Sequence, residues 1–452
     1  VKVDATTVLF ALAAAALVAI ACSLIPAMRA GQSHLALREG GRSGTAGRRQ
    51  HRVRGGLVAA QIALALVVLA GSGLLMRTFQ RLNAIRPGWD PEHVATFWTS
   101  LPRASYKNDL FVVQFYSRLV ERVAALPGVQ MVGVTSRLPL ETHAVSQNQN
   151  PLYPEDDPSY TTKLPPLQLF SAANADYFRA MGIPLLAGRT FDRMEAQREG
   201  DAIVSRSTAQ FFWKDPTGVA ALGKRFRPLP TGRWYTVVGV VGDTRDTGLA
   251  DPPSQAVYFP VTADPGSVLA GSQRTMALVV RTAGEPAAIV PAVRQVVHDL
   301  DPTQPVFDVR SMTAVLRAAT AQLSFIILIL SSAAAVTLVL GAVGLYGVLA
   351  YVVTLRRREL GIRIALGASP RAAAAAMARY GLTLTGVGIA FGLAIFALVA
   401  RFLRAQLFGV AASDPLTLGG STLILLAIAM LASWLPARRA ARVDPADALR
   451  SE

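Results

Sequence analysis

The residues nearest to a phosphate-binding motif are Gly218, Gly223 and Lys224, which follow the spacing G-x-x-x-x-G-K. A phosphate loop needs a Ser or Thr directly after the Lys, because that hydroxyl binds Mg²⁺. Here the next residue is Arg225, so the segment is interpreted as a turn that enters a strand over residues 224–227. The spacing therefore predicts no nucleotide site and no bound cofactor in this sequence.

Other groups that could do chemistry are dispersed. The five histidines lie far apart, and the sequence contains neither an H-E-x-x-H pair nor a G-x-S-x-G, so a metal site and a serine hydrolase are not expected. Asp243, Asp246 and Asp251 are close in sequence, but the Gly and Pro residues around them mark turns, which favours solvated loop carboxylates. We predict a protein with no catalytic residues and no metal ligands.

The strongest candidate for an interaction site is the segment RRRELGIRIALGASP, residues 356–370. Its start is basic, and Leu360 and Ile364 then fall on one side of a short helix. Gly367 can end that helical turn, and Ser369-Pro370 can start the next helix. Such an element offers a rigid surface to a cytoplasmic partner, but the spacing alone fits a plain basic loop that sets topology equally well.

Five apolar stretches could position this segment at a membrane surface. Each approaches the roughly 20 residues that cross a bilayer, and none contains Lys, Arg, Asp or Glu. A soluble helix of this length would carry polar residues on one face. The predicted spans are residues 8–25, 57–76, 325–353, 381–399 and 418–435.

The positions of the charges distinguish two classes of protein. The net charge of +16 suits a nucleic-acid binder or a membrane protein with basic cytoplasmic loops. Three short segments, residues 27–54, 355–379 and 437–452, carry +12 of it, whereas the large insert, residues 77–324, carries only +3. Five alternating spans place all three basic segments on one side, which the positive-inside rule assigns to the cytoplasm. We therefore predict a multi-pass membrane protein with an external insert, and no nucleic-acid partner.

Strand and helix patterns alternate along the insert. Residues 94–101, 108–126 and 129–135 are predicted as strand, helix and strand, and a matching unit over residues 276–281, 285–300 and 306–310 closes the insert. Between these units shorter strands are predicted, such as residues 202–205, 235–241 and 256–260. The apolar stripe of the first helix is expected at Phe111, Phe115, Leu119, Val123 and Leu126. The predicted fold class is an α-helical transmembrane bundle of five spans, with a large α+β domain, split between strand–helix–strand units, inserted between the second and third spans.

Several stretches resemble those of FtsX-like/MacB-like ABC transporter permeases, in the family's order. They are RRRELGIRIALGAS, VVGVVGDTRDTGLADPPSQAVYFP, DLDPTQPVFDVRSM, AVGLYGVLAYVV and LPARRAARVDPADALR. The resemblance implies a porter-like periplasmic core domain and a coupling helix that docks on an ATPase. The family's coupling positions carry over to Arg358, Glu359, Gly361, Arg363, Gly367 and Ala368. MacB carries its own N-terminal ATPase; the duplicated-permease subfamily, which LALREGGRSG and the opening span resemble, is expected to have none, so the ATP would be bound by a partner chain.

A short internal repeat accompanies this resemblance. Residues 23–30, SLIPAMRA, align with residues 433–440, SWLPARRA, and both join the end of a span to a basic turn through a Pro. Many spans end in this way, so chance is one explanation. The other is that residues 1–38 are the tail of a first permease half that precedes this sequence. The protein would then be a pseudo-dimer of two halves, or a homodimer.

The predicted organisation combines these features. Residues 1–30 form the last span of a preceding half, 31–54 a basic cytoplasmic linker, 55–80 a span, 81–322 a MacB-like periplasmic core domain, and 323–452 an FtsX-like permease domain with three spans and a coupling loop over 355–379. Five glycines within the spans are expected to allow close helix packing: Gly341, Gly344, Gly347, Gly388 and Gly392.

The expected function is that of a permease subunit in the inner (plasma) membrane, which couples ATP hydrolysis by a separate cytoplasmic ATPase to movement of a periplasmic domain. The spans contain no charged residue that could form an ion relay, which favours mechanotransmission, with export or efflux of an unidentified substrate. Its expected partners are the lipid bilayer, the ABC ATPase and a periplasmic or outer-membrane protein. The alternatives are a membrane receptor with an external sensor domain and, less well supported, a membrane enzyme.

Overall fold

The computed structural model describes residues 44–141, 149–192, 200–264, 266–269, 273–355, 369–404 and 407–441. The chain divides into two compact units. The first comprises residues 1–67, 335–396 and 422–452, and the second comprises residues 68–334 and 397–421. The expected first span, residues 8–25, lies outside the described residues.

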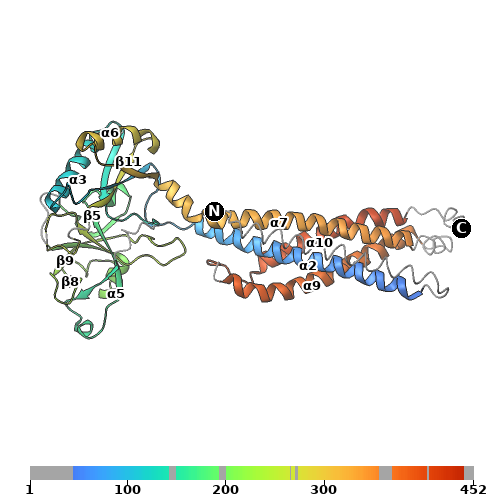
Figure 1. The fold of residues 1–452 in the computed structure, drawn as a ribbon. Coiled ribbons are helices and arrows are strands. Elements are labelled where there is room, and N and C mark those ends of the chain that lie inside the picture. The colour runs from blue at the N-terminus through green and yellow to red at the C-terminus, as the bar shows by residue number, and fades with distance from the viewer. Residues whose placement is uncertain are drawn as a thin grey trace. The chain divides into compact units, whose positions relative to one another are not determined.

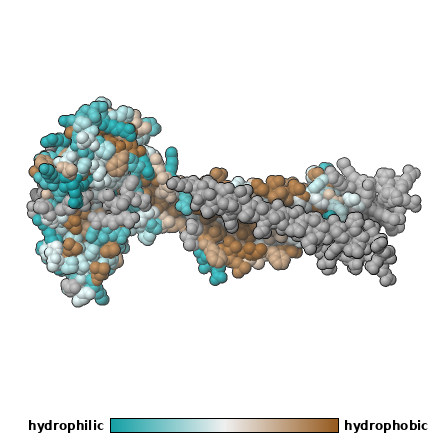
Figure 2. Space-filling view, in the orientation of Figure 1, coloured by the Kyte–Doolittle hydropathy of each residue, from teal (hydrophilic) through white to brown (hydrophobic). Residues whose placement is uncertain are grey.

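Four long helices in the described residues are apolar enough to cross a membrane. They contain the second to fifth expected spans, and each span is longer than expected: residues 54–83, 312–354, 375–403 and 415–436. The helices that hold them are α2 (Gly44–Asn83), α7 (Met312–Leu355), α9 (Pro370–Leu403) and α10 (Pro415–Ala441). Figure 2 shows apolar residues gathered over the helices, whereas polar residues cover much of the α/β domain.

Within the first unit, α2, α7, α9 and α10 run side by side (Figure 1) and share an apolar core. Leu66 and Leu349 are fully buried in this core, and Leu345 is buried to 1% exposure. The outward faces of the same helices remain apolar, as in Leu328, Val343 and Phe391. Apolar residues on all sides are typical of helices that contact lipid, which agrees with the expectation of membrane helices.

The α/β domain belongs to the second unit, and its described residues form one sheet of twelve strands. At one end the order is β12-β1-β11-β2, all in antiparallel pairs. The strands are β1 (Val94–Ser100), β2 (Val129–Thr135), β11 (Thr275–Thr282) and β12 (Val306–Ser311). Strands from the two ends of the insert thus interleave, which is the split βαβ arrangement. The predicted pair of strand–helix–strand units is confirmed.

The connecting helices of these units, α3 (Asp109–Ala124) and α6 (Val290–Leu300), lie next to one another (Figure 1) and pack on the same apolar core. The expected stripe of α3 is wrong at Phe111, whose side chain is 48% exposed. Phe111 lies in the first turn, where Asn108 caps the helix by accepting a hydrogen bond from the Phe111 N–H. The buried face is formed instead by Val112, Phe115, Tyr116, Leu119 and Val123.

The rest of the sheet continues in the order β5-β10-β7-β9-β8-β4, with β3 paired to β5 and β6 paired to β9. Here β5 and β10 are parallel, as are β7 and β9. The predicted strands at residues 235–241 and 256–260 are confirmed with those bounds. The elements are β3 (Gln149–Pro151), β4 (Tyr153–Pro154), β5 (Leu167–Ala173), α4 (Tyr177–Ala180), β6 (Leu185–Gly188), β7 (Asp201–Ser205), α5 (Arg206–Trp213), β8 (Arg225–Arg227), β9 (Tyr235–Val241) and β10 (Ala256–Pro260).

A second apolar cluster joins the sheet to the start of α7. It contains Trp98 of β1, Tyr177 and Phe178 of α4, and the α7 residues Met312 and Val315. Met312 is fully buried and Val315 is 2% exposed. The first turn of α7 is therefore part of the core of the α/β domain.

Candidate functional site: the coupling segment and the helices that bound it

The expected coupling residues Arg358, Glu359, Gly361, Arg363, Gly367 and Ala368 lie outside the described residues. The structure describes the helices on both sides of them: α7 ends at Leu355 and α9 begins at Pro370. A Pro at the first helical position has no N–H to leave unsatisfied, so it suits this start. The expected start of a helix at Ser369-Pro370 is confirmed.

The end of α7 next to the coupling segment is held against α2. The Arg54 guanidinium of α2 lies over the ring of Tyr351, with 4.2 Å between the guanidinium carbon and the ring centroid. Val352 and Val353 are buried in the shared helix core. A cation over an aromatic face contributes about 0.5–1 kcal/mol when exposed. The contact connects these two helices one turn before the coupling segment.

The opposite end of α7 is anchored by both packing and capping. Ser311, at the end of β12, accepts a hydrogen bond from the Ala314 N–H through its hydroxyl oxygen, at 3.2 Å. This satisfies one of the four N–H groups that a helix start leaves without intrahelical partners. From there α7 continues as one helix over 44 residues to Leu355. Residues 313–324, which follow β12, therefore continue without a break into the third expected span.

Two of the five expected packing glycines meet the backbone of α2. A Cβ added to Gly388 would lie 2.8 Å from Ile62 Cβ and 2.9 Å from the Ala59 carbonyl oxygen. At Gly392 the same atom would lie 3.0 Å from the Ala63 carbonyl oxygen. Small residues four apart on both helices, Gly388 with Gly392 and Ala59 with Ala63, allow this approach. A larger side chain at either glycine would separate the two helices.

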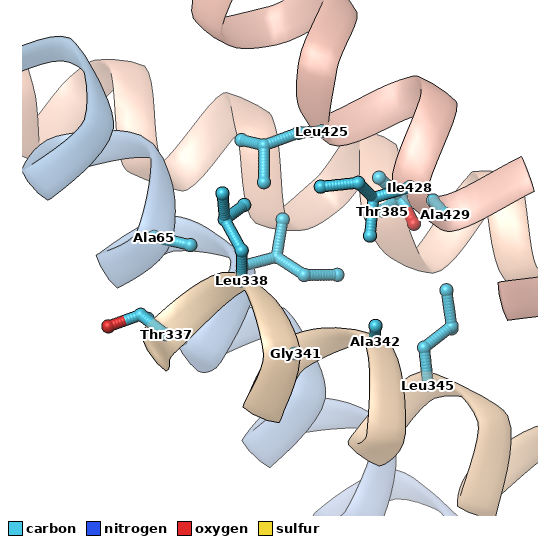
Figure 3. A pocket seen from close by; sticks show the side chains of 11 residues that line it. Ala65, Thr337, Leu338, Gly341, Ala342, Leu345, Thr385, Leu425, Ile428 and Ala429 are labelled. Atoms are coloured by element: carbon cyan, nitrogen blue, oxygen red, sulfur yellow. The ribbon is translucent and has the colours of Figure 1, made fainter. Parts of the chain in front are cut away.

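The three glycines of α7 have different surroundings. A Cβ at Gly344 would lie 2.7 Å from the Gln61 side-chain oxygen, which is the end of a flexible side chain. At Gly341 and Gly347 no heavy atom of the described residues lies within 4 Å of that position. Gly341 borders a cavity of about 20 Å³ (Figure 3). The lining is nearly all apolar: Ile62, Ala65, Thr337, Leu338, Gly341, Ala342, Leu345, Thr385, Leu425, Ile428 and Ala429.

An ion pair between α2 and the start of α10, both parts within the second unit, was not anticipated from the sequence. The Arg77 guanidinium donates to the Asp414 carboxylate, which also accepts from the Thr417 hydroxyl at 2.6 Å and the Thr417 N–H at 2.9 Å. The hydrogen bonds from Thr417 and from Arg77 hold the pKa of Asp414 below its ordinary value. The available signal was Asp414-Pro415, an N-cap residue followed by a first-turn Pro.

The segment with G-x-x-x-x-G-K spacing forms a turn before β8, as expected. Gly218 and Gly223 have positive φ angles of 84° and 76°. The Lys224 ammonium pairs with the Asp156 carboxylate at 2.8 Å, and Arg225 pairs with Glu155 at 3.1 Å. Its cations therefore lie against protein carboxylates.

The three aspartates that follow β9 were expected to be solvated, and that expectation is wrong for Asp243 and Asp246. The Asp243 side chain is 10% exposed and pairs with Arg206 at 3.1 Å. Asp246 is 6% exposed, and its carboxylate accepts a hydrogen bond from the Thr244 hydroxyl at 3.0 Å. Burial raises the pKa of Asp246 above its ordinary value. The charge of Arg137 and the hydroxyls of Thr244 and Ser254 act in the opposite direction but do not outweigh burial. Polar partners make the burial tolerable, and sequence spacing does not reveal partners as distant as Arg137.

Comparisons with known proteins match nearly the whole described chain. The family model for the MacB-like periplasmic core domain matches residues 56–296, and that for the FtsX-like permease C-terminal region matches residues 331–445. Among the described residues no group of three or more His, Cys, Asp or Glu side chains could hold a metal ion.

The chain is similar to curated transport proteins. It is 27% identical over 331 residues to the macrolide export ATP-binding/permease protein MacB of Azoarcus sp. (strain BH72), covering 69% of this chain and 48% of that protein. The protein of the same description from Escherichia coli (strain K12) is 26% identical over 314 residues, covering 69% and 46%. The chain thus spans about half the length of the curated relatives it matches.

Among solved structures, the periplasmic region of MacB from Actinobacillus actinomycetemcomitans is 13% identical, with a TM-score of 0.35, and covers 53% of this chain and 97% of that one.

Proposed function

This chain belongs to the family defined by the MacB-like periplasmic core domain, and from that premise we propose that it is a permease subunit of an ABC transporter. In this proposal a separate cytoplasmic ATPase binds and hydrolyses ATP, and the permease transmits the resulting motion to its periplasmic domain. The output is mechanical, with export or efflux of a substrate as its consequence. The protein spans the inner membrane several times.

The observation that carries the proposal is the continuity of α7. Its first turn is buried in the core of the α/β domain through Met312 and Val315, and its last residue, Leu355, is next to the proposed coupling segment. A helix is stiff along its axis because each backbone N–H is bonded to the carbonyl four residues earlier. A displacement imposed at one end of α7 is therefore delivered to the other end.

The proposed contact with the ATPase uses the segment between α7 and α9. Arg358 and Arg363 would pair with acidic groups of the ATPase, whereas Glu359 would pair with a basic one. Gly361 and Gly367 would permit close approach of the backbone. The cation–aromatic contact between Arg54 and Tyr351 would hold the α7 end of this segment in position.

The test is co-purification of the full chain with its ATPase from the native membrane, with the ATPase identified by mass spectrometry. The variant Glu359→Lys with Gly361→Asp reverses one charge and adds another at the proposed contact. The matched control is Glu285→Lys with Gly284→Asp, which makes the same changes at exposed positions of the α/β domain where a Cβ has open space.

We expect the coupling variant to lose most of the ATPase and its stimulated hydrolysis, while the control retains both. Association and stimulation equal to those of the native chain would rule out the coupling assignment. Labelling of cysteines introduced at Ser43 and Ser159, in a chain with Cys22→Ser, tests the topology independently. The two sites should react from opposite sides of the membrane, and reaction from one side would contradict the proposed spans.

A further inference from the structure

A groove runs between α9 and α10 in the first unit and encloses about 740 Å³. Its lining includes Ala375 and Leu382 of α9 and Met430 and Trp434 of α10, and it is apolar apart from the buried hydroxyl of Ser433. The two helices are antiparallel, because the early part of α9 faces the late part of α10. The lining on α9 spans residues 375–382, which is about 10 Å of helix. The groove therefore has the size of a site for part of an extended alkyl chain.

Two arginines lie toward one end of this helix pair, the end where α9 starts and α10 finishes. Arg379 follows Ala375 by four residues and precedes Leu382 by three, so helical periodicity puts it on the face that lines the groove. Arg438 follows Trp434 by four residues, and its guanidinium lies 4.4 Å from the centroid of the Trp434 ring. Both helices contribute one cation to the same end of the groove.

The helices supply no anion for these two cations. Residues 370–403 and 415–441 contain no Asp or Glu. Among the described residues, every ion pair joins other side chains, and neither Arg379 nor Arg438 takes part in one. A guanidinium held over an aromatic face can still donate its N–H groups from its own edge, in the fork geometry that binds phosphate. The described parts of α9 and α10 thus present two cations without a carboxylate of their own, and this charge is complementary to an anionic ligand.

The position of Trp434 indicates which ligand this is. Its side chain is 54% exposed at the end of an apolar span, and Trp at such positions lies at the level of the lipid headgroups. Basic pockets between membrane helices on the cytoplasmic side bind acidic headgroups. We propose that the α9–α10 groove binds one anionic phospholipid, with an acyl chain along the apolar lining and the headgroup phosphate between Arg379 and Arg438.

This lipid site depends on the membrane orientation of α9 and α10 but not on coupling to an ATPase, so the two proposals can fail separately. A bound lipid would fill a gap beside the close approach of the two helices at Gly381 and Ser433. The site would therefore connect the lipid composition of the cytoplasmic leaflet to the packing of the permease bundle.

Trp434 provides a local probe, because the other four tryptophans, Trp89, Trp98, Trp213 and Trp234, belong to the second unit. The full chain is reconstituted in phosphatidylcholine vesicles that contain a minor fraction of acyl-brominated phosphatidylglycerol or acyl-brominated phosphatidylcholine. Bromine quenches indole fluorescence at short range, and subtracting the Trp434→Phe spectrum isolates the contribution of Trp434. We expect the brominated anionic lipid to quench Trp434 at an about fivefold lower mole fraction than the zwitterionic lipid.

The charges are tested with Arg379→Gln combined with Arg438→Gln, against Arg401→Gln as the matched control. Arg401 is an exposed arginine near the other end of α9. In the double variant both brominated lipids should quench Trp434 at the same mole fraction. The control should keep the native preference for the anionic lipid. Equal quenching by both lipids in the native chain would mean that the groove contacts bulk lipid only. Absence of quenching by either would mean that protein, such as a second copy or another span, fills the groove. Either result overturns the proposal.

Discussion

In the α/β domain the most deeply buried side chains are large: Trp98, Tyr116 and Phe170 are each 1% exposed or less. In the helix bundle two backbones come close together at residues with almost no side chain, Gly388 and Gly392 against Ala59 and Ala63. Water drives large apolar side chains out of solution in the first region, whereas lipid is as apolar as leucine and gives no such force in the second. The bundle therefore depends on close van der Waals approach.

The difference extends to polar groups. The buried Trp98 indole N–H donates to the Glu141 carboxylate at 2.8 Å, and the Tyr116 hydroxyl donates to two backbone carbonyls. In the bundle the hydroxyls that the structure describes mostly bond within their own helix, as Thr385 does to the Gly381 carbonyl. Polar contacts between elements thus add specificity in the α/β domain, whereas helix-to-helix specificity in the bundle rests on shape.

The largest expected effect is in the α/β domain. Trp98→Ala removes the ring from the second apolar cluster and one donor from Glu141, and it should cost about 3–5 kcal/mol of unfolding free energy. Urea unfolding of the full chain in detergent, followed by the fluorescence of the remaining tryptophans, measures this loss. Trp98→Phe keeps most of the ring and should recover more than half of it. Equal losses in both variants would mean that the hydrogen bond, rather than the volume, dominates this core.

The matching substitution in the bundle adds only one methyl group, and its effect on stability should be smaller. Gly388→Ala brings a Cβ to within 2.9 Å of the Ala59 carbonyl oxygen, so α2 or α9 must shift, at an expected cost of about 1–3 kcal/mol. Gly386→Ala is the control on the same helix, because a Cβ there meets no atom within 4 Å in the described residues. Thermal loss of helical circular dichroism in detergent should occur earlier for the first variant alone. Identical curves would show that α9 does not depend on its contact with α2.

The α/β domain should also lose folding stability at acidic pH, and this effect should be of intermediate size. Asp301 accepts hydrogen bonds from the Thr303 hydroxyl and N–H and from the Tyr106 hydroxyl, and these bonds lower its pKa to about 2. A lowered pKa stabilises the folded state above the pKa of the unfolded chain, about 3.9. That stability is lost as the pH falls from about 5 toward 2.

Asp301→Asn should remove this pH-dependent part, which we expect to be about 1 kcal/mol after solvent screening. Melting temperatures of the full chain between pH 7 and pH 3 provide the measurement. The variant should lose less stability on acidification than the native chain. Parallel pH profiles would mean that the hydrogen bonds to Asp301 do not persist in solution.

Much of the fold could be predicted because its signals are local. The alternation of polar and apolar residues placed β2 at residues 129–135 and β9 at residues 235–241, and uninterrupted apolar runs placed four spans. Phe111 was assigned to the wrong face because a helical stripe can begin one residue later with almost the same spacing. Tyr116 was overlooked because its hydroxyl suggests exposure, although two carbonyls accept its hydrogen bonds.

Less of the candidate site could be predicted, because it depends on which helices meet. The sequence identifies glycines in the spans but does not indicate that Gly388 faces α2 while Gly341 borders a cavity. The pair of Arg77 and Asp414 is separated by 337 residues, so no local pattern reports it. The coupling positions rest on family resemblance and stay a prediction.

The smallest expected effect is a gain in stability rather than a loss. At Gly341 an added Cβ meets no atom within 4 Å in the described residues, so Gly341→Ala should gain helix propensity without a clash. Alanine is favoured over glycine inside a helix by about 0.5–1 kcal/mol, and the variant should unfold slightly later than the native chain in the same detergent. Gly341→Ala and Gly388→Ala thus make the same chemical change with opposite results, because only one of the two glycines lies against another backbone. Destabilisation by Gly341→Ala would mean that a surface outside the described residues packs on this face of α7.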